Sequence, residues 1–424
     1  MNISAPRGTK DILPQEIKKW HYVEDVMRSV CADFAYQEIR TPIFEHTELF
    51  QRGIGDTTDV VEKEMYTFCD RGGRSITLRP ENTAAVVRSY IENKLYADGG
   101  VSKLFYLGPM FRYDRPQAGR LRQFNQFGVE VLATSEPLID AEIISLAYHI
   151  LQKLGLKDLK LLINSVGCPK CRPQHKEKLK EFFKPKLQQL CTDCQSRYDR
   201  NPLRILDCKV EKCKTLSVGA PSLAECLCEE CRAHFTAVKE YLEEISIPYE
   251  LDDGLVRGLD YYTKTAFEIQ YSPLGAQSAV CGGGRYDGLV QEIGGPQTAG
   301  IGFAMGIERI LLALEKQNLL PETSEQVDVF IVVPDQENRK LGFKIAYELR
   351  KKGISTVIDS IPRSMKAQLK QANKLQAEKV LLLGAEELSR QKVVLKDMLK
   401  SEQQEIAIEN IALILAKTGV QKNG

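Results

Sequence analysis

The sequence predicts an α+β domain that is interrupted by a cysteine-rich helical insertion and followed by a separate α/β domain. Strand and helix patterns mix up to about Asn164, cysteines concentrate between Gly167 and Ser246, and strands alternate with helices after residue 326. The chain has 424 residues, enough for two or three domains of roughly 100–200 residues each. We expect the first domain at residues 1–164, where the insertion of residues 165–246 interrupts it, and its remainder at residues 247–318. The last domain is expected at residues 327–424.

The first domain contains a predicted hairpin with a long loop. KLFYLGPMFRYD (103–114) alternates like a strand, Pro and Gly interrupt the pattern in RPQAGR, and alternation resumes in LRQFNQFGVEVL (121–132). Side chains two residues apart share one face of a strand, so Arg122, Phe124 and Gln126 are expected on the same face.

The same periodicity places Glu130 on that face, and Arg112 on the matching face of the first strand. Charged strand faces are usually solvated. However, exposure to water does not stabilise an aromatic side chain such as Phe124, and Glu130 has apolar neighbours in the sequence. A guanidinium beside an aromatic ring suits a nucleotide, because the ring stacks on the base and the guanidinium binds phosphate. The pattern therefore favours a binding site over a solvated face.

Three other stretches combine glycine or proline with polar residues. In TLRPENTAAVV (77–87), Glu81 and Thr83 fall at a strand-to-helix junction, where they either cap the helix or bind an ammonium group. CGGGRYDGLV (281–290) is either a turn or a place of close backbone approach, and it lacks the GK[ST] of a phosphate-binding loop. GIGFAMGIERILLAL (300–314) is not GxGxxG, so a nicotinamide-dinucleotide fold is not supported.

Nine of the twelve cysteines lie in the expected insertion. Cys168, Cys171, Cys191 and Cys194 form two C-x2-C pairs separated by nineteen residues, within the zinc-ribbon range of roughly 15–20. Four thiolates would make a closed structural Zn2+ site. The remaining cysteines of this stretch could supply a second site, and the alternative is a set of reduced, unligated thiols. None of the five histidines has the H-E-x-x-H spacing of a catalytic metal site.

After residue 326 the pattern changes to alternating strands and helices. VDVFIVVP predicts a buried strand, and ENRKLGFKIAYELRKKG predicts an amphipathic helix that ends at Gly353. Further strands are predicted at ISTVIDS, EKVLLLG and KVVLKDM. This βαβαβ order predicts an α/β domain with a largely parallel sheet.

Composition narrows the class of protein. A formal net charge of +1 excludes a uniformly basic nucleic-acid binder, so any polyanion would have to meet a local basic patch. The sequence shows no signal segment and no apolar run long enough to span a bilayer, which predicts a cytoplasmic protein without membrane contact. Cytoplasmic cysteines stay reduced, so clusters of them favour metal over disulfides.

Together these stretches resemble the histidyl-tRNA synthetases, a class II aminoacyl-tRNA synthetase family, over nearly the whole chain. YQEIRTPIFE (36–45) resembles the dimer-forming motif 1, FRYDRPQAGRLRQFNQFGVE (111–130) motif 2, and GIGFAMGIERILL (300–312) motif 3. VRGLDYY (256–262) and CGGGRYDGLV (281–290) resemble the two histidyl signatures.

The resemblance implies an antiparallel six-stranded catalytic sheet flanked by helices, and an anticodon-binding role for the last domain. It implies a homodimer that uses ATP and Mg2+ to convert L-histidine to histidyl-adenylate and pyrophosphate. The enzyme then transfers histidine to the 3′ end of tRNA(His).

Residue roles also follow from the resemblance. ATP binding is implied for Arg112, Arg120, Phe124 and Arg309, with Phe124 stacked on adenine. Histidine binding is implied for Glu81, Asn82, Thr83, Arg112, Gln126, Glu130, Arg257, Tyr261, Tyr262 and Tyr286. Catalytic roles are implied for Arg112, Arg257 and Gln126, with Arg257 at the α-phosphate in place of a metal ion. The chain has Asn82, Asp114 and Asn125 where the family often has Gly, Glu and His.

Two alternatives stay open at this point. One is a non-catalytic paralogue that regulates the first enzyme of histidine biosynthesis, but such proteins usually lack the last domain and have degraded signatures. The other is a class II synthetase for a different amino acid. The combination of Glu130 and Tyr262 favours histidine.

Overall fold

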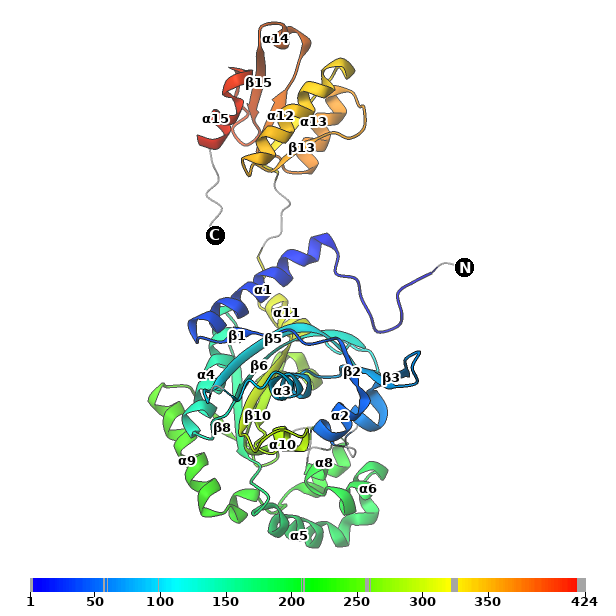
Figure 1. Cartoon of the computed structure of the whole chain (residues 1–424), viewed down its shortest axis with the longest axis vertical. Helices are drawn as coiled ribbons and strands as arrows, with labels where there is room; N and C mark the ends of the chain where they lie inside the picture. Colours follow the sequence, from blue (N-terminus) through cyan, green and yellow to red (C-terminus); the bar gives the residue numbers. More distant parts are fainter. Residues whose placement is uncertain are drawn as a thin grey trace. The chain divides into compact units, whose positions relative to one another are not determined.

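The computed structural model describes residues 3–55, 58, 60–97, 99–206, 208, 210–255, 259, 261–321 and 327–417. The chain divides into two compact units, Met1–Pro321 and Glu322–Gly424, and each has its own hydrophobic core. Figure 1 shows both units with their helices and strands labelled.

A mixed sheet of eight strands forms the centre of the first unit, in the order β1-β5-β6-β11-β10-β9-β7-β8. The six inner strands pair antiparallel: β5 (Ser102–Phe111), β6 (Gln123–Leu132), β11 (Gly300–Gly306), β10 (Ala279–Arg285), β9 (Thr263–Tyr271) and β7 (Leu159–Ser165). The edge strands β1 (Gln37–Glu38) and β8 (Glu250–Leu251) pair parallel. The number of six strands implied by the resemblance was therefore wrong, because a two-residue parallel strand extends the six antiparallel strands at each edge.

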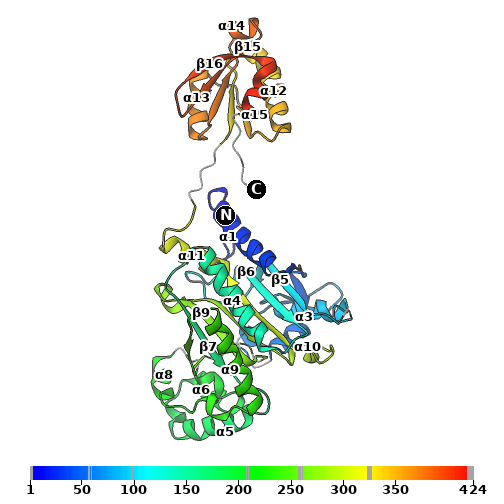
Figure 2. The same ribbon diagram turned by 90° about the vertical axis from the view of Figure 1, so that its left-hand side faces the viewer.

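One face of this sheet is covered by four helices, α1 (Pro14–Asp33), α4 (Pro137–Lys153), α9 (Glu229–Glu244) and α11 (Ile307–Lys316). The helix predicted around residues 20–34 is the C-terminal part of α1, which buries Trp20, Val23 and Met27 at helical spacing. These side chains share a core with Phe127 and Val129 of β6. Figure 2 shows α4 and α9 in front of β7 and β9. Gln126 and Glu130 alternate with Phe127 and Val129 along β6, so their side chains point to the other face of the sheet.

The other face of the sheet carries smaller elements. Helices α2 (Thr47–Ile54), α3 (Thr83–Glu92) and α10 (Leu289–Glu292) pack there, together with the π-helical turn η1 (Val60–Glu64). A three-stranded antiparallel sheet adjoins them, in the order β2 (Phe44–His46), β4 (Ser75–Leu78) and β3 (Tyr66–Cys69).

The cysteine-rich insertion follows β7 and consists of short helices. They are α5 (Arg172–Phe183), η2 (Lys184–Gln189), α6 (Thr192–Arg200), α7 (Leu203–Leu206), α8 (Glu211–Ser217) and η3 (Leu223–Cys226). The next helix, α9, buries Val238 and Leu242 in the core of the central sheet. The last helix of the stretch assigned to the insertion therefore packs on the sheet.

The second unit has a five-stranded sheet with helices on both faces. The strand order is β13 (Thr356–Ile358), β12 (Val329–Val332), β14 (Lys379–Leu382), β15 (Lys392–Asp397) and β16 (Gln403–Ala407). The first three strands are parallel, and the last two are antiparallel to their neighbours. The sheet is thus less parallel than expected, because the anticipated strand β15 pairs antiparallel with β14, and the polar strand β16 was not anticipated.

Two separate cores in this unit place helices on each side of its sheet. The helices are α12 (Arg339–Lys351), α13 (Met365–Lys374), α14 (Ala385–Ser389) and α15 (Ile411–Lys417). Three short 3-10 turns complete the two units, η4 (Ser272–Gln277), η5 (Gln336–Asn338) and η6 (Ile408–Asn410).

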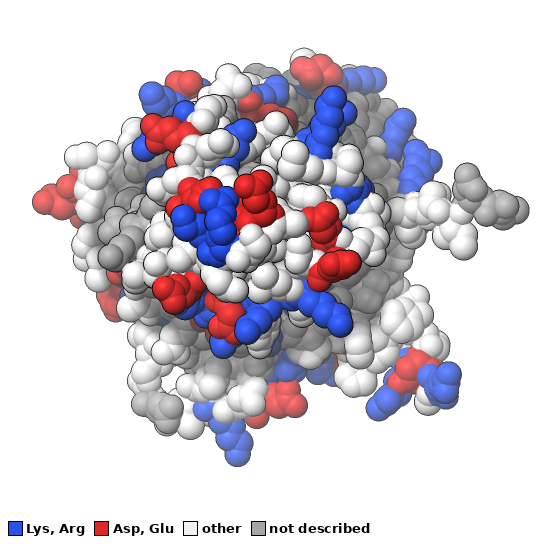
Figure 3. Space-filling view, turned by 90° about the horizontal axis from the view of Figure 1, so that it is seen from above, with Lys and Arg blue, Asp and Glu red and all other residues white. Residues whose placement is uncertain are grey.

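Charges of both signs lie close together on the face of the molecule seen from above (Figure 3). On the face drawn in Figure 3, Lys and Arg side chains alternate with Asp and Glu, in keeping with the net charge of +1. No helix in the described part of the chain is long and apolar enough to cross a membrane.

Candidate active site

A cavity of about 820 Å³ lies on the face of the central sheet opposite the four large helices. Among the predicted site residues, the following line it: Glu81, Thr83, Arg112, Arg120, Phe124, Gln126, Glu130, Tyr261, Tyr262, Tyr286 and Arg309. The structure therefore brings together motifs that are up to 228 positions apart, from Glu81 to Arg309. Arg257 lies outside the described residues.

Glu130 lies at the buried end of this cavity, with only 1% of its surface exposed. One carboxyl oxygen accepts a hydrogen bond from Thr83 Oγ1 at 2.7 Å, and the other accepts one from the Tyr286 hydroxyl at 2.5 Å. Gly302 lies opposite Glu130 in the register of β11 and β6, and a Cβ there would approach Glu130 Oε2 to 1.9 Å. Glycine at this position makes room for the carboxyl group.

Burial raises the pKa of Glu130 to about 8, and the neighbouring Glu81 carboxylate also raises it. The hydrogen bonds from Tyr286 and Thr83 stabilise the anion and oppose this rise. The folded protein therefore binds a proton at Glu130 between the ordinary pKa of 4.5 and about 8, whereas the unfolded chain does not. Stability is consequently lost as pH rises through this window.

We expect Glu130→Gln to remove this pH-dependent loss. Relative to the variant, the wild-type protein should become less stable from pH 5 to pH 8, by on the order of a few kcal/mol, with no further change above the window. Tyr286→Phe removes a hydrogen bond that lowers the pKa of Glu130, so it should extend the window to higher pH. Thermal unfolding of the three proteins across this pH range measures the effect. Parallel curves for wild type and Glu130→Gln would contradict it.

Glu81 is buried at the N-terminus of α3. Its carboxyl oxygens accept hydrogen bonds from the backbone N–H groups of Thr83 at 2.7 Å and Ala84 at 3.0 Å. Burial nevertheless raises its pKa, while these bonds and nearby Arg112 act to lower it. The helix-capping alternative is therefore realised, and the same carboxyl group lines the cavity.

Asn82, in contrast, does not line the cavity. Its Oδ1 accepts hydrogen bonds from Thr41 Oγ1 at 2.7 Å and from Arg79 Nη1 at 3.2 Å. Its backbone has an ordinary φ of −120°, so no glycine-like conformation is needed there. The Asn82 side chain therefore lies behind the cavity wall, and the implied contact of Asn82 with histidine stays a prediction.

Four tyrosines surround the Glu130 end of the cavity. The ring centroids of Tyr261 and Tyr262 are 4.7 Å apart, and those of Tyr261 and Tyr286 are 5.7 Å apart. Tyr106 was missed in the sequence, although it shares the alternation of β5 with Arg112. It lies opposite Gly128, where a Cβ would approach its hydroxyl to 2.3 Å.

Among the described residues that line the cavity, two buried side-chain atoms have no hydrogen-bond partner, Gln126 Oε1 and the Tyr106 hydroxyl. A buried acceptor without a partner costs about 1–3 kcal/mol. Gln126 is 9% exposed and lines the cavity. Its free oxygen is therefore placed to accept a hydrogen bond from a ligand N–H group.

The opposite end of the cavity is rich in arginine. Arg112 donates from Nε to the Pro80 carbonyl at 2.8 Å, and its guanidinium carbon is 5.5 Å from the ring centroid of Phe124. No carboxylate of the described residues forms an ion pair with Arg112. Its charge is therefore available to an anionic ligand.

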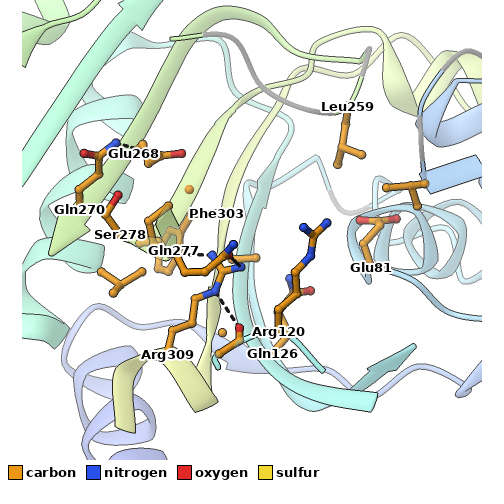
Figure 4. Close-up of a pocket in the computed structure, with 18 of the residues that line it drawn as sticks. Glu81, Arg120, Gln126, Leu259, Glu268, Gln270, Gln277, Ser278, Phe303 and Arg309 are labelled. Carbon is orange, nitrogen blue, oxygen red and sulfur yellow. Dashed lines mark hydrogen bonds between the residues drawn. The ribbon is translucent and has the colours of Figure 1, made fainter. Parts of the chain in front are cut away.

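Arg309 is held rigidly by three acceptors, the carbonyls of Gly119 at 3.0 Å and Ala279 at 2.8 Å and Gln277 Oε1 at 2.7 Å. Burial lowers its pKa, followed by repulsion from Arg112 and Arg120. Figure 4 shows Arg309 beside Gln277, with Arg120 between them and Glu81. An anion bound here would relieve the repulsion among the three guanidinium groups.

Two other arginines of the hairpin already have partners within the protein. Arg120 forms ion pairs with Asp114 and, at 3.6 Å, with Glu64. Arg122 is not part of the cavity lining, and its guanidinium carbon lies 3.9 Å from the ring centroid of Tyr113. Arg122 precedes β6, which begins at Gln123, and the shared face with Phe124 stays a prediction.

The glycine-rich stretch 281–290 provides close strand packing. A Cβ on Gly283 would approach the carbonyl oxygen of Gly302 to 2.3 Å, so backbone does approach closely, from the neighbouring strand. Arg285 is fully buried and donates from Nε to Asp140 Oδ1 at 3.0 Å. Asp140 also accepts a hydrogen bond at 2.8 Å from His234, when Nε2 of that ring carries the proton. These charged groups stabilise the fold away from the cavity.

The four cysteines predicted as one metal site lie in two different clusters. Cys168 and Cys171 meet Cys228 and Cys231, whereas Cys191 and Cys194 meet Cys208 and Cys213. The chain leaves the sheet after β7 and returns through α9, which brings the first C-x2-C pair to the last one. Sequence spacing alone could not show this, so the predicted grouping was wrong.

Comparisons with known proteins agree along the whole chain. The profile of the family described as Histidyl-tRNA synthetase matches residues 8–310, and that of the Anticodon binding domain matches residues 326–418. The histidine–tRNA ligase of Desulforamulus reducens is 54% identical over 98% of this chain and 99% of its own. That of Desulfitobacterium hafniense strain DCB-2 is 52% identical over 98% of each chain. The crystal structure of apo S. aureus histidyl-tRNA synthetase superimposes with a TM-score of 0.83 at 43% identity, covering 98% of this chain and 100% of that one.

The chain has the fold of a class II aminoacyl-tRNA synthetase with an anticodon-binding domain. The first unit supplies the antiparallel sheet with its arginine-rich cavity, and the second is the separate α/β unit. The chain belongs to the histidyl-tRNA synthetase family.

Proposed function

We propose that this chain is a histidine–tRNA ligase, which activates L-histidine with ATP and transfers it to the 3′ end of tRNA(His). One observation supports this above all others. A single cavity has a buried carboxyl group among tyrosines at one end and three guanidinium groups at the other. The first end suits an imidazole and the second suits a triphosphate.

Histidine fits the buried end through its ring nitrogens. Glu130 shares a proton with one of them, and a tyrosine hydroxyl from Tyr261 or Tyr262 meets the other. The ammonium group donates to Gln126 Oε1, which is otherwise without a partner in the described structure, and approaches Glu81 and Thr83. A pocket of this kind rejects amino acids without matching polar groups by about 10⁴–10⁵, because its own groups would stay buried and unpaired.

ATP fits the arginine-rich end. Adenine stacks on Phe124, and the phosphates meet Arg112, Arg309 and Arg120, which together supply the positive charge. Glu268 lines the cavity and accepts a hydrogen bond from Gln270 at 2.6 Å, and its carboxylate is an oxygen ligand of the kind Mg2+ prefers. When bound, Mg2+ would neutralise charge on the leaving pyrophosphate.

The two groups that react in the first step, the histidine carboxylate and the α-phosphate of ATP, are both anions. A carboxylate oxygen of histidine forms a bond to the α-phosphorus, and the bond to the bridging oxygen breaks, so that the electron pair leaves with pyrophosphate. Arg112 and, by resemblance, Arg257 stabilise charge on the phosphoryl oxygens. No general base is needed because the attacking carboxylate is already ionised. In the second step a terminal ribose hydroxyl of tRNA attacks the adenylate and releases AMP.

The direct test is ATP–pyrophosphate exchange with each of the twenty amino acids, followed by charging of tRNA(His). We expect exchange with histidine alone, and histidyl-tRNA as the product. Exchange with another amino acid would indicate that the chain is a synthetase for that amino acid and not for histidine. No exchange at all, with histidine still bound, would support the regulatory paralogue.

We also propose an anticodon-binding role for the second unit. Its separate cores indicate that the first unit can be expressed without it. A chain ending at Pro321 should retain histidine-dependent pyrophosphate exchange and lose charging efficiency by at least about 100-fold, because it lacks the tRNA contacts of residues 327–424. Steady-state charging against tRNA concentration measures this loss. Equal charging by both chains would contradict the role.

We further propose a cytoplasmic homodimer. Ile43 and Phe44, in the stretch that resembles motif 1, are 44% and 57% exposed in the single chain. Two adjacent exposed apolar side chains fit burial against a second copy of the chain. We also propose that the chain divides into domains at residues 1–164, 165–246, 247–318 and 327–424.

A further inference from the structure

Two groups of four cysteines stand out in the insertion. The first group is Cys168, Cys171, Cys228 and Cys231, and the second group is Cys191, Cys194, Cys208 and Cys213. Within each group all four sulfur atoms lie within 4.8 Å of one another. We infer that the chain binds two structural Zn2+ ions, one in each group.

The sulfur spacing fits tetrahedral zinc. In the first group, the Sγ atom of Cys168 is 3.6 Å from that of Cys171 and 3.8 Å from that of Cys228. In the second group, the Sγ atoms of Cys191 and Cys208 are 3.8 Å apart. Four sulfurs at the Zn–S distance of about 2.3 Å have an edge of about 3.8 Å between them. A disulfide would require about 2.05 Å, so these cysteines are not bonded to one another, and their spacing fits ligands around an ion.

Backbone donors support the same assignment. The N–H of Cys228 donates to Cys171 Sγ at 3.1 Å, and the N–H of Cys191 donates to Cys213 Sγ at 3.3 Å. Such bonds orient the sulfur atoms and stabilise negative charge on them, as outer partners of metal ligands do. The two groups thus share one arrangement, although they come from unrelated parts of the insertion.

The donor set narrows the choice of metal to zinc or a single iron ion, of which we propose zinc. An all-sulfur tetrahedral site suits zinc or iron. The two histidines of this region bind elsewhere, His175 to the Pro221 carbonyl and His234 to Asp140. Sulfur atoms this close together leave space for one ion and not for an iron–sulfur cluster.

The first group joins the insertion to the central sheet. Cys168 and Cys171 follow β7, and Cys228 and Cys231 stand at the start of α9. Arg172, which follows Cys171, donates from Nε to the Val166 carbonyl at 3.1 Å and from Nη2 to the Tyr262 carbonyl. Zinc in this group would therefore fix the backbone of Tyr262, which lines the active-site cavity.

The second group holds together helices that are too short to be stable alone. Helices α6, α7 and α8 have nine, four and seven residues, far below the roughly 12–15 at which isolated helices become marginal. Their shared core is small, so metal binding would supply folding free energy. Leu206, Cys208 and Lys214 of this region also line the cavity, which makes the second group a support for its outer wall.

The test is the zinc content of the purified full-length chain and of matched variants. We expect two zinc ions per wild-type chain, one in Cys171→Ser, one in Cys213→Ser and none in the double variant. Cys226→Ser is the control, because this cysteine is buried in the same stretch and belongs to neither group, and it should retain two. A single-group variant that keeps two ions would remove that group from the inference.

A second measurement does not depend on the variants folding. X-ray absorption at the zinc edge of the wild-type protein should show four sulfur neighbours at about 2.3 Å. Nitrogen or oxygen neighbours, bound iron in place of zinc, or a metal-free chain that takes up neither Zn2+ nor Co2+ would overturn the inference. Pyrophosphate exchange on the same sample keeps the two proposals separate. An inactive protein with two zinc ions refutes only the ligase, and an active protein without zinc refutes only the metal sites.

Discussion

Glu130→Ala should lower histidine-dependent pyrophosphate exchange by at least about three orders of magnitude in kcat/KM while leaving ATP binding unchanged. The carboxyl group accepts hydrogen bonds from both Thr83 and Tyr286 at the buried end of the cavity, and both of these groups would lose their partner. Histidine would then enter a pocket in which its ring nitrogen and two protein hydroxyls compete for the remaining acceptors.

The matched controls separate charge from packing. Glu130→Gln keeps the shape of the side chain, and we expect it to lose exchange almost as fully while gaining stability above pH 8. Glu142→Gln should leave exchange near wild type, because Glu142 accepts hydrogen bonds from Tyr36 and Lys103 and is not part of the cavity lining. Unchanged exchange in Glu130→Ala would refute the recognition of histidine by this residue. A variant that is more stable and inactive would show that the buried carboxyl group is retained for function at a cost in stability.

Arg112→Ala should lower the rate of adenylate formation by about 10²–10³, the scale for loss of one preorganised group that stabilises transition-state charge. Arg112 is placed for this by its bond to the Pro80 carbonyl and by the Phe124 ring beneath it. Arg112→Lys should recover little of the rate, because a lysine ammonium group cannot form paired hydrogen bonds to phosphoryl oxygens.

Arg122→Ala is the control, since Arg122 belongs to the same hairpin but stacks on Tyr113 outside the cavity lining. We expect less than about a tenfold effect there. Single-turnover formation of histidyl-adenylate measures the step directly, apart from histidine and ATP binding. Equal losses in Arg112→Ala and Arg122→Ala would indicate damage to the hairpin and would contradict the charge role of Arg112.

Much of the site was predictable because it depends on local periodicity. The alternation on β6 separates Gln126 and Glu130 from Phe127 and Val129, and the structure places the two pairs on opposite faces of the sheet. The same rule would have found Tyr106 on β5, which shares its face with Arg112. Arg122 has the same periodicity but precedes the strand and stacks on Tyr113 outside the cavity lining.

The amino-acid sequence by itself determined the two-unit organisation, the faces of the hairpin and the chemical character of the cavity, since each follows from composition or from short-range spacing. Only the tertiary structure decided which groups meet across the chain: that Asn82 supports the wall from behind, that Arg120 pairs with Asp114, and that Cys168 joins Cys228 rather than Cys191. The physical reason is that a side chain's face depends on its neighbours in sequence, whereas its partner depends on the path by which distant segments return to the sheet.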